Sequence, residues 1–142
     1  MTAALSHADL AALHTSCFTM PRPWSETEFA GLLSSYGVFL VTGDGPSFAM
    51  GRVIAGEAEL LTLAVNPSGQ RHGFGRAALA RYETEARTRD AEASFLEVAA
   101  TNTPAINLYL SHGYTESGRR RGYYTAADGS KIDALVLSKL LD

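Results

Sequence analysis

The chain has 142 residues, which suits one domain and is too short for two of ordinary size. Hydrophobic residues make up 46% and charged residues 19%, a balance that excludes an intrinsically disordered protein. The net charge of −3 gives no electrostatic argument for nucleic-acid binding. Because no long apolar run and no leader pattern is present, we expect a cytoplasmic protein that binds neither nucleic acid nor membrane.

The N-terminal quarter of the chain predicts a short edge strand and two helices. The strand is expected at residues 1–5, and apolar residues recur with helical spacing over residues 10–17. Two prolines end this first helix. Ser25, followed three residues later by Glu28, forms a capping box that predicts a second helix through about Ser34.

Three apolar runs then predict an antiparallel meander. They cover residues 38–41, 47–54 and 57–65, and glycine-containing turns separate them. Connections this short join antiparallel neighbours, so we expect these strands to be adjacent in one sheet.

A long helix is predicted from about Arg71 to Asp90. It places Leu79, Tyr82 and Ala86 on its buried face. Four charged residues lie on the other face, which we interpret as solvated: Arg81, Glu85, Arg87 and Arg89. The next strand, residues 94–98, is reached through this helical crossover and should therefore run parallel to the strand that ends at Val65.

The C-terminal third predicts a helix and a hairpin. Asn102 or Thr103 can cap the helix, Pro104 suits its first turn, and Gly113 ends it. Strands follow at residues 114–124 and 131–139, joined by a turn at Asp128-Gly129.

The stretch from Gln70 to Arg76 carries the strongest functional signal. It enters a helix with two glycines and two arginines, Arg71, Gly73, Gly75 and Arg76. Helix N-termini attract anions, glycines allow close approach to the main chain, and arginines add charged hydrogen bonds. The loop therefore predicts a phosphate site, with an ordinary glycine-rich turn as the alternative.

Glycine spacing alone fits more than one kind of phosphate loop. A nucleotide P-loop needs Gly-Lys-Ser/Thr, whereas Gly75 is followed by Arg76 and Ala77, which excludes it. A dinucleotide fingerprint does match residues 73–78, with Glu97 as its ribose-binding acid. That fold places its fingerprint directly after the first strand, but here residues 66–72 intervene and the earlier strands look antiparallel.

Three polar side chains should meet this loop at one edge of the sheet. In open α/β sheets, ligands bind in the crevice at the carboxyl ends of the strands. Glu97 and Asn102 lie at or after such an end, and helical spacing turns Tyr109 back toward it. A carboxylate, an amide and a phenol are thus expected beside the phosphate site.

The loop has the pattern Gln/Arg-x-x-Gly-x-Gly/Ala and follows a strand that ends in Ala-Val-x-Pro. This pattern resembles the pyrophosphate loop of the GCN5-related N-acetyltransferases, the GNAT superfamily. Residues 96–109 with His112-Gly113-Tyr114 are similar to the second half of that fold. Pro23-Trp24-Ser25 and the run from Arg120 to Tyr124 resemble the bacterial ribosomal-protein-alanine N-acetyltransferases. The resemblance covers about residues 24–140.

This resemblance implies an α/β fold, a mixed and mostly antiparallel sheet of about six or seven strands with a splayed central parallel pair and about four helices. One such domain would span residues 1–142. It implies Glu97 as proton acceptor and Tyr109 as proton donor. Acetyl-CoA would be the cosubstrate, without a metal, and its implied binding residues are Leu63, Ala64, Val65, Arg71, His72, Gly73, Phe74, Gly75, Arg76 and Asn102.

The implied acceptor is the N-terminal α-amine of a protein, with an N-terminal alanine of a small-subunit ribosomal protein as the family's target. One alternative is transfer to a lysine or a small-molecule amine. The other is a non-catalytic acyl-CoA-binding module, against which the presence of both Glu97 and Tyr109 speaks.

Several other residues have more than one interpretation. Glu59 is a second carboxylate that could line the acceptor side. The run Arg119-Arg120-Arg121 is either a solvated set of charges, an anchor for a substrate carboxyl group or a means of ordering the hairpin. We interpret Cys17 as an apolar filler and Trp24 as a hydrophobic staple, and the four histidines lack metal-ligand spacing.

Overall fold

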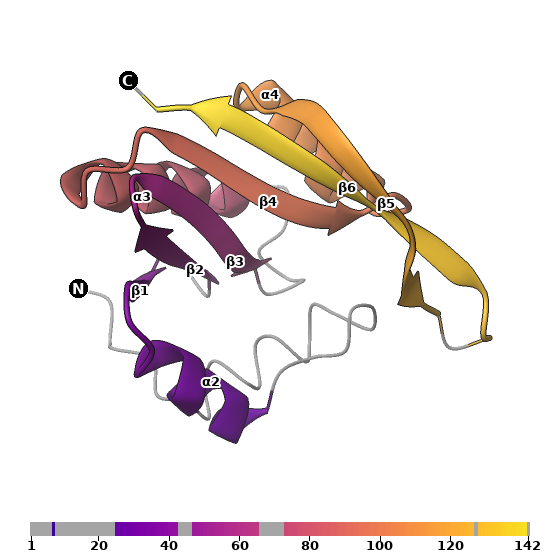
Figure 1. Ribbon diagram of the computed structural model, residues 1–142, viewed down its shortest axis with the longest axis horizontal. Helices are drawn as coiled ribbons and strands as arrows, with labels where there is room; N and C mark the ends of the chain where they lie inside the picture. Colours follow the sequence, from indigo (N-terminus) through magenta and orange to yellow (C-terminus); the bar gives the residue numbers. More distant parts are fainter. Residues whose placement is uncertain (1–6, 8–24, 43–46, 66–72, 127, 142) are drawn as a thin grey trace.

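The computed structural model describes residues 7, 25–42, 47–65, 73–126 and 128–141. This described part holds three helices and six strands (Figure 1). The helices are α2 (Glu26–Leu33), α3 (Phe74–Thr88) and α4 (Thr103–Ser111). The strands are β1 (Val38–Thr42), β2 (Ser47–Ile54), β3 (Glu57–Val65), β4 (Ala93–Ala99), β5 (Thr115–Thr125) and β6 (Lys131–Leu140). The predicted edge strand at residues 1–5, the first helix, Cys17 and Trp24 lie outside the described residues.

The six strands form one mixed sheet with the order β1-β2-β3-β4-β6-β5. All neighbours are antiparallel except β3 and β4, which are parallel. The predicted meander, crossover and hairpin are confirmed, and the predicted mixed α/β fold with its central parallel pair is confirmed with them. The fourth expected helix falls on residues outside the described part.

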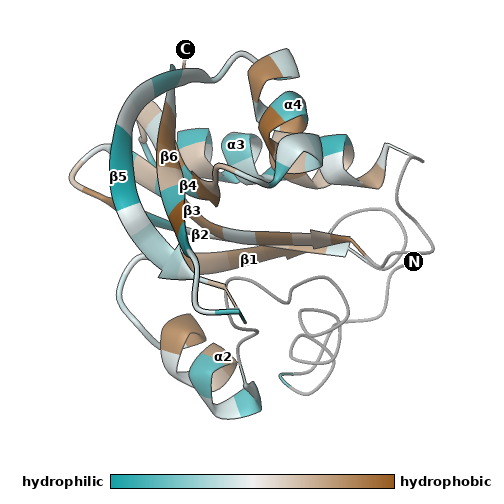
Figure 2. Ribbon diagram, turned by 90° about the vertical axis from the view of Figure 1, so that its right-hand side faces the viewer, coloured by the Kyte–Doolittle hydropathy of each residue, from teal (hydrophilic) through white to brown (hydrophobic). Residues whose placement is uncertain are grey.

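Helices cover the two faces of the sheet unequally. Helices α3 and α4 lie on one face and α2 lies on the other (Figure 2). The larger core, between the sheet and α3, includes Leu79, Tyr82 and Leu96. The smaller core, under α2, is built from Phe29, Phe48, Met50 and Ala64. Because strand side chains alternate between faces, neighbouring strand residues contribute to different cores.

The second helix begins as its capping box predicts. Ser25 Oγ accepts a hydrogen bond from the Glu28 N–H at 3.2 Å, and Glu28 Oε1 accepts one from the Ser25 N–H at 3.1 Å. Helix α3 begins at Phe74, whereas the sequence predicted a start near Arg71. Gly73 precedes it with a φ of 78°, a left-handed conformation in which the helix cannot continue backward.

The charged face of α3 is more than a solvated surface. Arg81 donates a hydrogen bond to the Thr42 carbonyl oxygen at 2.9 Å. The Arg89 guanidinium lies 4.7 Å from the Phe39 ring centroid and pairs with Glu85. Arg81, Arg87 and Arg89 are exposed as predicted, and in addition the face contacts β1, where the Arg89 guanidinium covers the Phe39 ring at the rim of the core.

A β-bulge bends β3 in the middle of the sheet. Met50 of β2 faces Thr62 and the next residue, Gly51, faces Leu60, so Leu61 is an extra residue in β3. Gly51 is required there, because a Cβ would lie 2.5 Å from the Tyr82 ring and 2.7 Å from the Phe39 ring. Bulges increase local twist, and this one changes the direction of β3 before its carboxyl end.

Candidate active site

The central parallel strands separate beyond the bulge. β3 and β4 pair only from Glu57 with Ala93 to Leu60 with Leu96, although both strands are described in full. Beyond that point β3 stays paired with β2 and β4 with β6, and Figure 1 shows the two ribbons diverging. The predicted splay is therefore present, and it leaves the facing edges of these two strand ends outside any shared β ladder.

The N-terminus of α3 lies at the end of the segment that follows β3, and it is built differently from the other described helix starts. Ser25 caps α2 and Asn102 caps α4 with side-chain oxygens, but Gly73 contributes no side-chain hydrogen bond to α3. The first turn of α3 carries no acidic residue, whereas α2 has Glu26 and Glu28 there. The positive end of the α3 dipole is thus not neutralised by the described side chains, which favours an anion.

Gly75 serves packing as well as access. A Cβ at this position would lie 3.3 Å from Leu108 Cδ2, 3.8 Å from Val65 and 3.9 Å from Leu63. The glycine therefore lets the first turn of α3 approach both α4 and the end of β3. Gly73, in contrast, has open space where a Cβ would be. The sequence interpretation treated the two glycines alike, and the structure distinguishes them.

The other predicted cofactor residues are only partly described. Leu63 and Val65 lie under the start of α3, and Ala64 points to the opposite face, into the α2 core. Phe74 is half-buried at the first position of α3. Arg76 is exposed and donates a hydrogen bond to Ser111 Oγ at 3.1 Å, which links α3 to the end of α4. Arg71 and His72 lie outside the described residues.

Asn102 stands at the junction between β4 and α4. Its N–H donates to the Ala99 carbonyl oxygen at 2.9 Å, and its Oδ1 accepts from the Ala105 N–H at 3.3 Å. Asn102, one of the two residues predicted to cap this helix, therefore caps α4 through its side-chain oxygen. The amide nitrogen and the second lone pair of Oδ1 remain for a ligand.

Glu97 lies on β4 just beyond the last residue paired with β3. Its neighbours Leu96 and Val98 belong to the large core under α3, so alternation directs Glu97 to the other face of the sheet. The side chain is 20% exposed, and Oε1 lies 3.2 Å from an Arg120 guanidinium nitrogen. Oε2 is buried and has no hydrogen-bond partner among the described residues.

Tyr109 lies on α4 and is 7% exposed. Its ring meets the Tyr114 ring edge to face, with centroids 6.0 Å apart. Burial raises the pKa of the Tyr109 phenol above its ordinary value, so the hydroxyl keeps its proton throughout the physiological range. No hydrogen bond among the described residues joins Tyr109 to Glu97, because the two side chains belong to opposite faces of the sheet, beside the splay between β3 and β4.

Two secondary candidates have structural partners. Glu59 Oε1 lies 2.6 Å from Arg52 on β2, so this carboxylate is engaged in a cross-strand ion pair. Arg119 pairs with Asp133 at 2.8 Å, and Asp133 also accepts a hydrogen bond from the Gly122 N–H. Arg119 therefore orders the hairpin, which was one of the three interpretations of the arginine run.

Sequence reasoning missed a buried carboxylate, Glu83. Its Oε1 lies 2.9 Å from Lys139 Nζ and 3.5 Å from His112 Nε2. The signal was present, because Leu79, Glu83 and Ala86 have the spacing of one buried helix face. Desolvation lowers the pKa of His112, although the Glu83 charge opposes that change.

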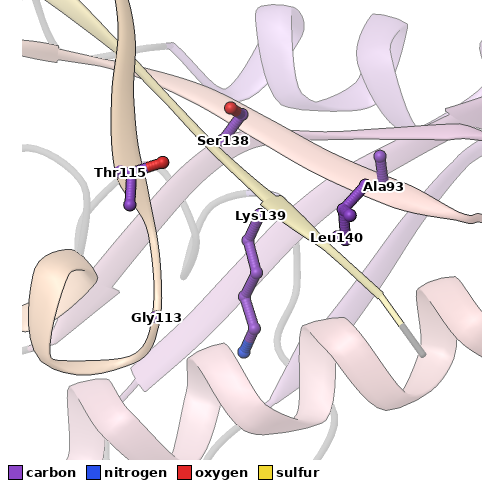
Figure 3. A pocket seen from close by; sticks show the side chains of 6 residues that line it. All are labelled: Ala93, Gly113, Thr115, Ser138, Lys139 and Leu140. Atoms are coloured by element: carbon purple, nitrogen blue, oxygen red, sulfur yellow. The ribbon is translucent and has the colours of Figure 1, made fainter.

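A hollow of about 430 Å³ lies at the opposite end of β4 from Glu97. Its lining residues are Ala93, Gly113, Thr115, Ser138, Lys139 and Leu140 (Figure 3). The Lys139 ammonium, which reaches toward α3, is already paired with Glu83. Within the described ranges, no group of three potential metal ligands is found and no helix is long and apolar enough to cross a membrane.

Comparisons with known proteins agree with this geometry. The model of the acetyltransferase (GNAT) family matches residues 9–114. The [ribosomal protein bS18]-alanine N-acetyltransferase of Escherichia coli K12 is 39% identical over 139 residues, which cover 95% of this chain and 93% of that protein.

Solved structures show the same arrangement. The crystal structure of the Escherichia coli ribosomal-protein-S18-alanine N-acetyltransferase superposes with a TM-score of 0.83 and 33% identity, covering 96% of this chain and 88% of that one. Arabidopsis thaliana NAA60 in complex with acetyl-CoA has the same fold, with a TM-score of 0.80 and 16% identity over 96% of this chain and 93% of that one. The chain therefore belongs to the acetyltransferase (GNAT) family and is an N-acetyltransferase.

Proposed function

We propose that this enzyme transfers the acetyl group of acetyl-CoA to the N-terminal α-amine of a protein, with the N-terminal alanine of a small-subunit ribosomal protein as its acceptor. The activity of the Escherichia coli relative, a [ribosomal protein bS18]-alanine N-acetyltransferase that matches nearly the whole chain, supports the acceptor. The structural observation that carries the proposal is the splay of β3 and β4 beside an α3 N-terminus without a side-chain cap. With such an acceptor, the reaction would take place in the cytoplasm.

The cosubstrate would bind where these two features meet. The N-terminal turn of α3, with Gly73 and Arg76, suits the pyrophosphate, and Arg71 and His72 would complete that loop. The facing edge of β3, at Leu63, Ala64 and Val65, suits an extended pantetheine arm that adds to the sheet through main-chain hydrogen bonds. The amide nitrogen of Asn102 would contact the same ligand at the start of α4.

Direct transfer needs one proton acceptor and one proton donor. The amine nitrogen attacks the thioester carbonyl carbon, the C–S bond breaks, and the proton lost by the nitrogen passes to Glu97. Tyr109 gives its proton to the departing thiolate, and because burial raises the pKa of this phenol, it is protonated before the transfer. Main-chain N–H groups at the splay would stabilise the developing oxyanion.

The ionisation of the acceptor favours an α-amine over a lysine. An amine attacks only when neutral, and an α-amino group has a pKa of about 7.7–8.0 against about 10.4 for lysine. At about 1.4 kcal/mol per pKa unit, the neutral lysine costs about 3–4 kcal/mol more. One carboxylate is therefore an adequate base for an N-terminal amine.

Acetyl transfer to two matched peptides, followed by mass spectrometry, tests the proposal. One peptide has a free N-terminal alanine and an arginine-rich continuation, and the other is N-terminally blocked with an internal lysine. We expect acetylation of the first peptide only, at its α-amine. Transfer to lysine alone would assign the enzyme to the alternative acceptor class, and acetyl-CoA binding without transfer to either peptide would indicate a small-molecule acceptor or a non-catalytic role.

A further inference from the structure

Arg120 of β5 reaches across the sheet to the proposed base. Its guanidinium lies 3.2 Å from Glu97 Oε1, although β6 lies between β5 and β4. Val136 of β6 faces Glu97 on one side and Gly118 on the other. Arg120 itself faces Ala134 of β6, so only a short β6 side chain stands at that position between the two charges. The ion pair therefore depends on the order of the three strands.

The two oxygens of Glu97 have different surroundings. Oε1 is paired with Arg120, whereas Oε2 is buried and unpartnered among the described residues. A buried carboxylate oxygen without a hydrogen bond is costly, so such an atom needs an explanation. The ion pair with Arg120 is therefore the contact that holds this carboxylate in one orientation.

Aromatic side chains hold the guanidinium in place. Arg120 is 57% exposed, and its guanidinium carbon lies 5.3 Å from the Tyr123 ring centroid. Tyr123 in turn meets Tyr124 edge to face at 5.1 Å. Burial raises the pKa of Tyr124 and the charge of Glu97 raises it further, so this phenol is neutral beside the carboxylate. The charged partner of Glu97 on β5 is therefore Arg120.

We propose that Arg120 is a positioning residue, which binds Oε1 of Glu97 and thereby fixes the orientation of the carboxylate that accepts the proton of the amine. This inference rests on the proposed role of Glu97 as proton acceptor. The guanidinium also adds a fixed positive charge beside the amine, and a like charge disfavours the protonated form of that amine. The guanidinium of Arg120 therefore favours the neutral, nucleophilic form of the acceptor amine, and its ion pair with Glu97 orients the base.

A double-mutant cycle tests whether Arg120 acts through Glu97. With the free-alanine peptide as acceptor, we expect Glu97→Gln to lower kcat by about 10²–10⁴-fold. Arg120→Gln should lower kcat by about tenfold, because a misplaced base loses part of its effect. In the Glu97→Gln background, Arg120→Gln should cost nothing further. Arg120→Lys, which keeps the charge, should recover part of the loss.

The controls separate this role from a structural one. Arg121→Gln removes the next arginine, which is also exposed, and should leave kcat unchanged. Acetyl-CoA affinity and the thermal unfolding midpoint should be the same in all variants. Equal losses from Arg120→Gln in both backgrounds, or no loss at all, would overturn the positioning role and leave the proposed function intact. A wild-type protein that acetylates neither peptide would overturn the proposed function and this inference together.

Discussion

Lys139 of β6 places its Nζ 2.9 Å from Oε1 of Glu83 on α3. Glu83 is 3% exposed and Lys139 is 21% exposed, so helix and strand are joined by a largely buried ion pair. His112, the C-cap of α4, approaches the same oxygen at 3.5 Å. Strand β6 and two helices that carry candidate site residues, α3 and α4, are thus tied together at one carboxylate.

Removal of one partner of this pair should destabilise the fold. Lys139→Met leaves a buried carboxylate with weaker partners, so we expect a loss of about 3 kcal/mol in the free energy of unfolding. Urea denaturation measures it. The double variant Glu83→Leu/Lys139→Met should regain most of that stability, because a buried ion pair can be replaced by apolar groups at little cost. If the double variant is less stable than the single one, the Glu83–Lys139 ion pair adds more to the free energy of unfolding than the desolvation of its two charges costs.

The stability of the protein should fall in mild acid because of His112. Desolvation lowers the pKa of His112 from its ordinary 6.5, so the fold favours the neutral ring. The stabilisation is complete above pH 6.5 and is lost as the pH falls through the lowered pKa. Glu83 opposes this shift, while Lys139, Arg76 and Arg87 reinforce it.

The urea midpoint at about pH 7.5 and about pH 5.5 measures this effect. The wild-type protein should lose more stability across that interval than His112→Gln, which cannot be protonated. A smaller loss in the wild-type protein would mean that attraction to Glu83 exceeds desolvation.

Tyr109→Phe should separate catalysis from binding. The ring remains packed against Tyr114, so we expect an unchanged thermal midpoint and acetyl-CoA affinity. Turnover should fall by about 10²-fold, because the thiolate departs without its proton donor. Isothermal titration and an acetyl-transfer assay measure the two quantities. A parallel loss of acetyl-CoA affinity would contradict the role of Tyr109 as proton donor.

Gly75→Asp should abolish acetyl-CoA binding and also lower the thermal midpoint. The new carboxylate would oppose the pyrophosphate, and its Cβ would press on Leu108 at 3.3 Å. Gly31→Asp is a matched control, because Gly31 lies on α2 with nothing within 4 Å of a Cβ. Titration with acetyl-CoA and differential scanning calorimetry should show both effects in the Gly75 variant and neither in the control.

The sequence by itself determined the elements and their order. Apolar runs bounded by turns, helical spacing, the Ser25 capping box and the Asp128-Gly129 turn predicted every described helix and strand, and all but one start lie within two residues of the prediction. These signals are local, because they depend on the backbone conformation of a few consecutive residues. The family resemblance also rests on contiguous motifs, and it predicted the mixed sheet and the splayed pair.

Tertiary structure decided which of these residues meet. The strand order β4-β6-β5 brings Arg120 to Glu97, and the placement of α3 on the sheet brings Glu83 within reach of Lys139 of β6. The periodicity of a strand does not specify its neighbours, so neither pair could be predicted from the chain. The start of α3 at Phe74 and the extra residue Leu61 likewise follow from a left-handed glycine and from strand register. Local patterns select conformations, but only the packing of segments that are distant in the sequence determines which charges become partners.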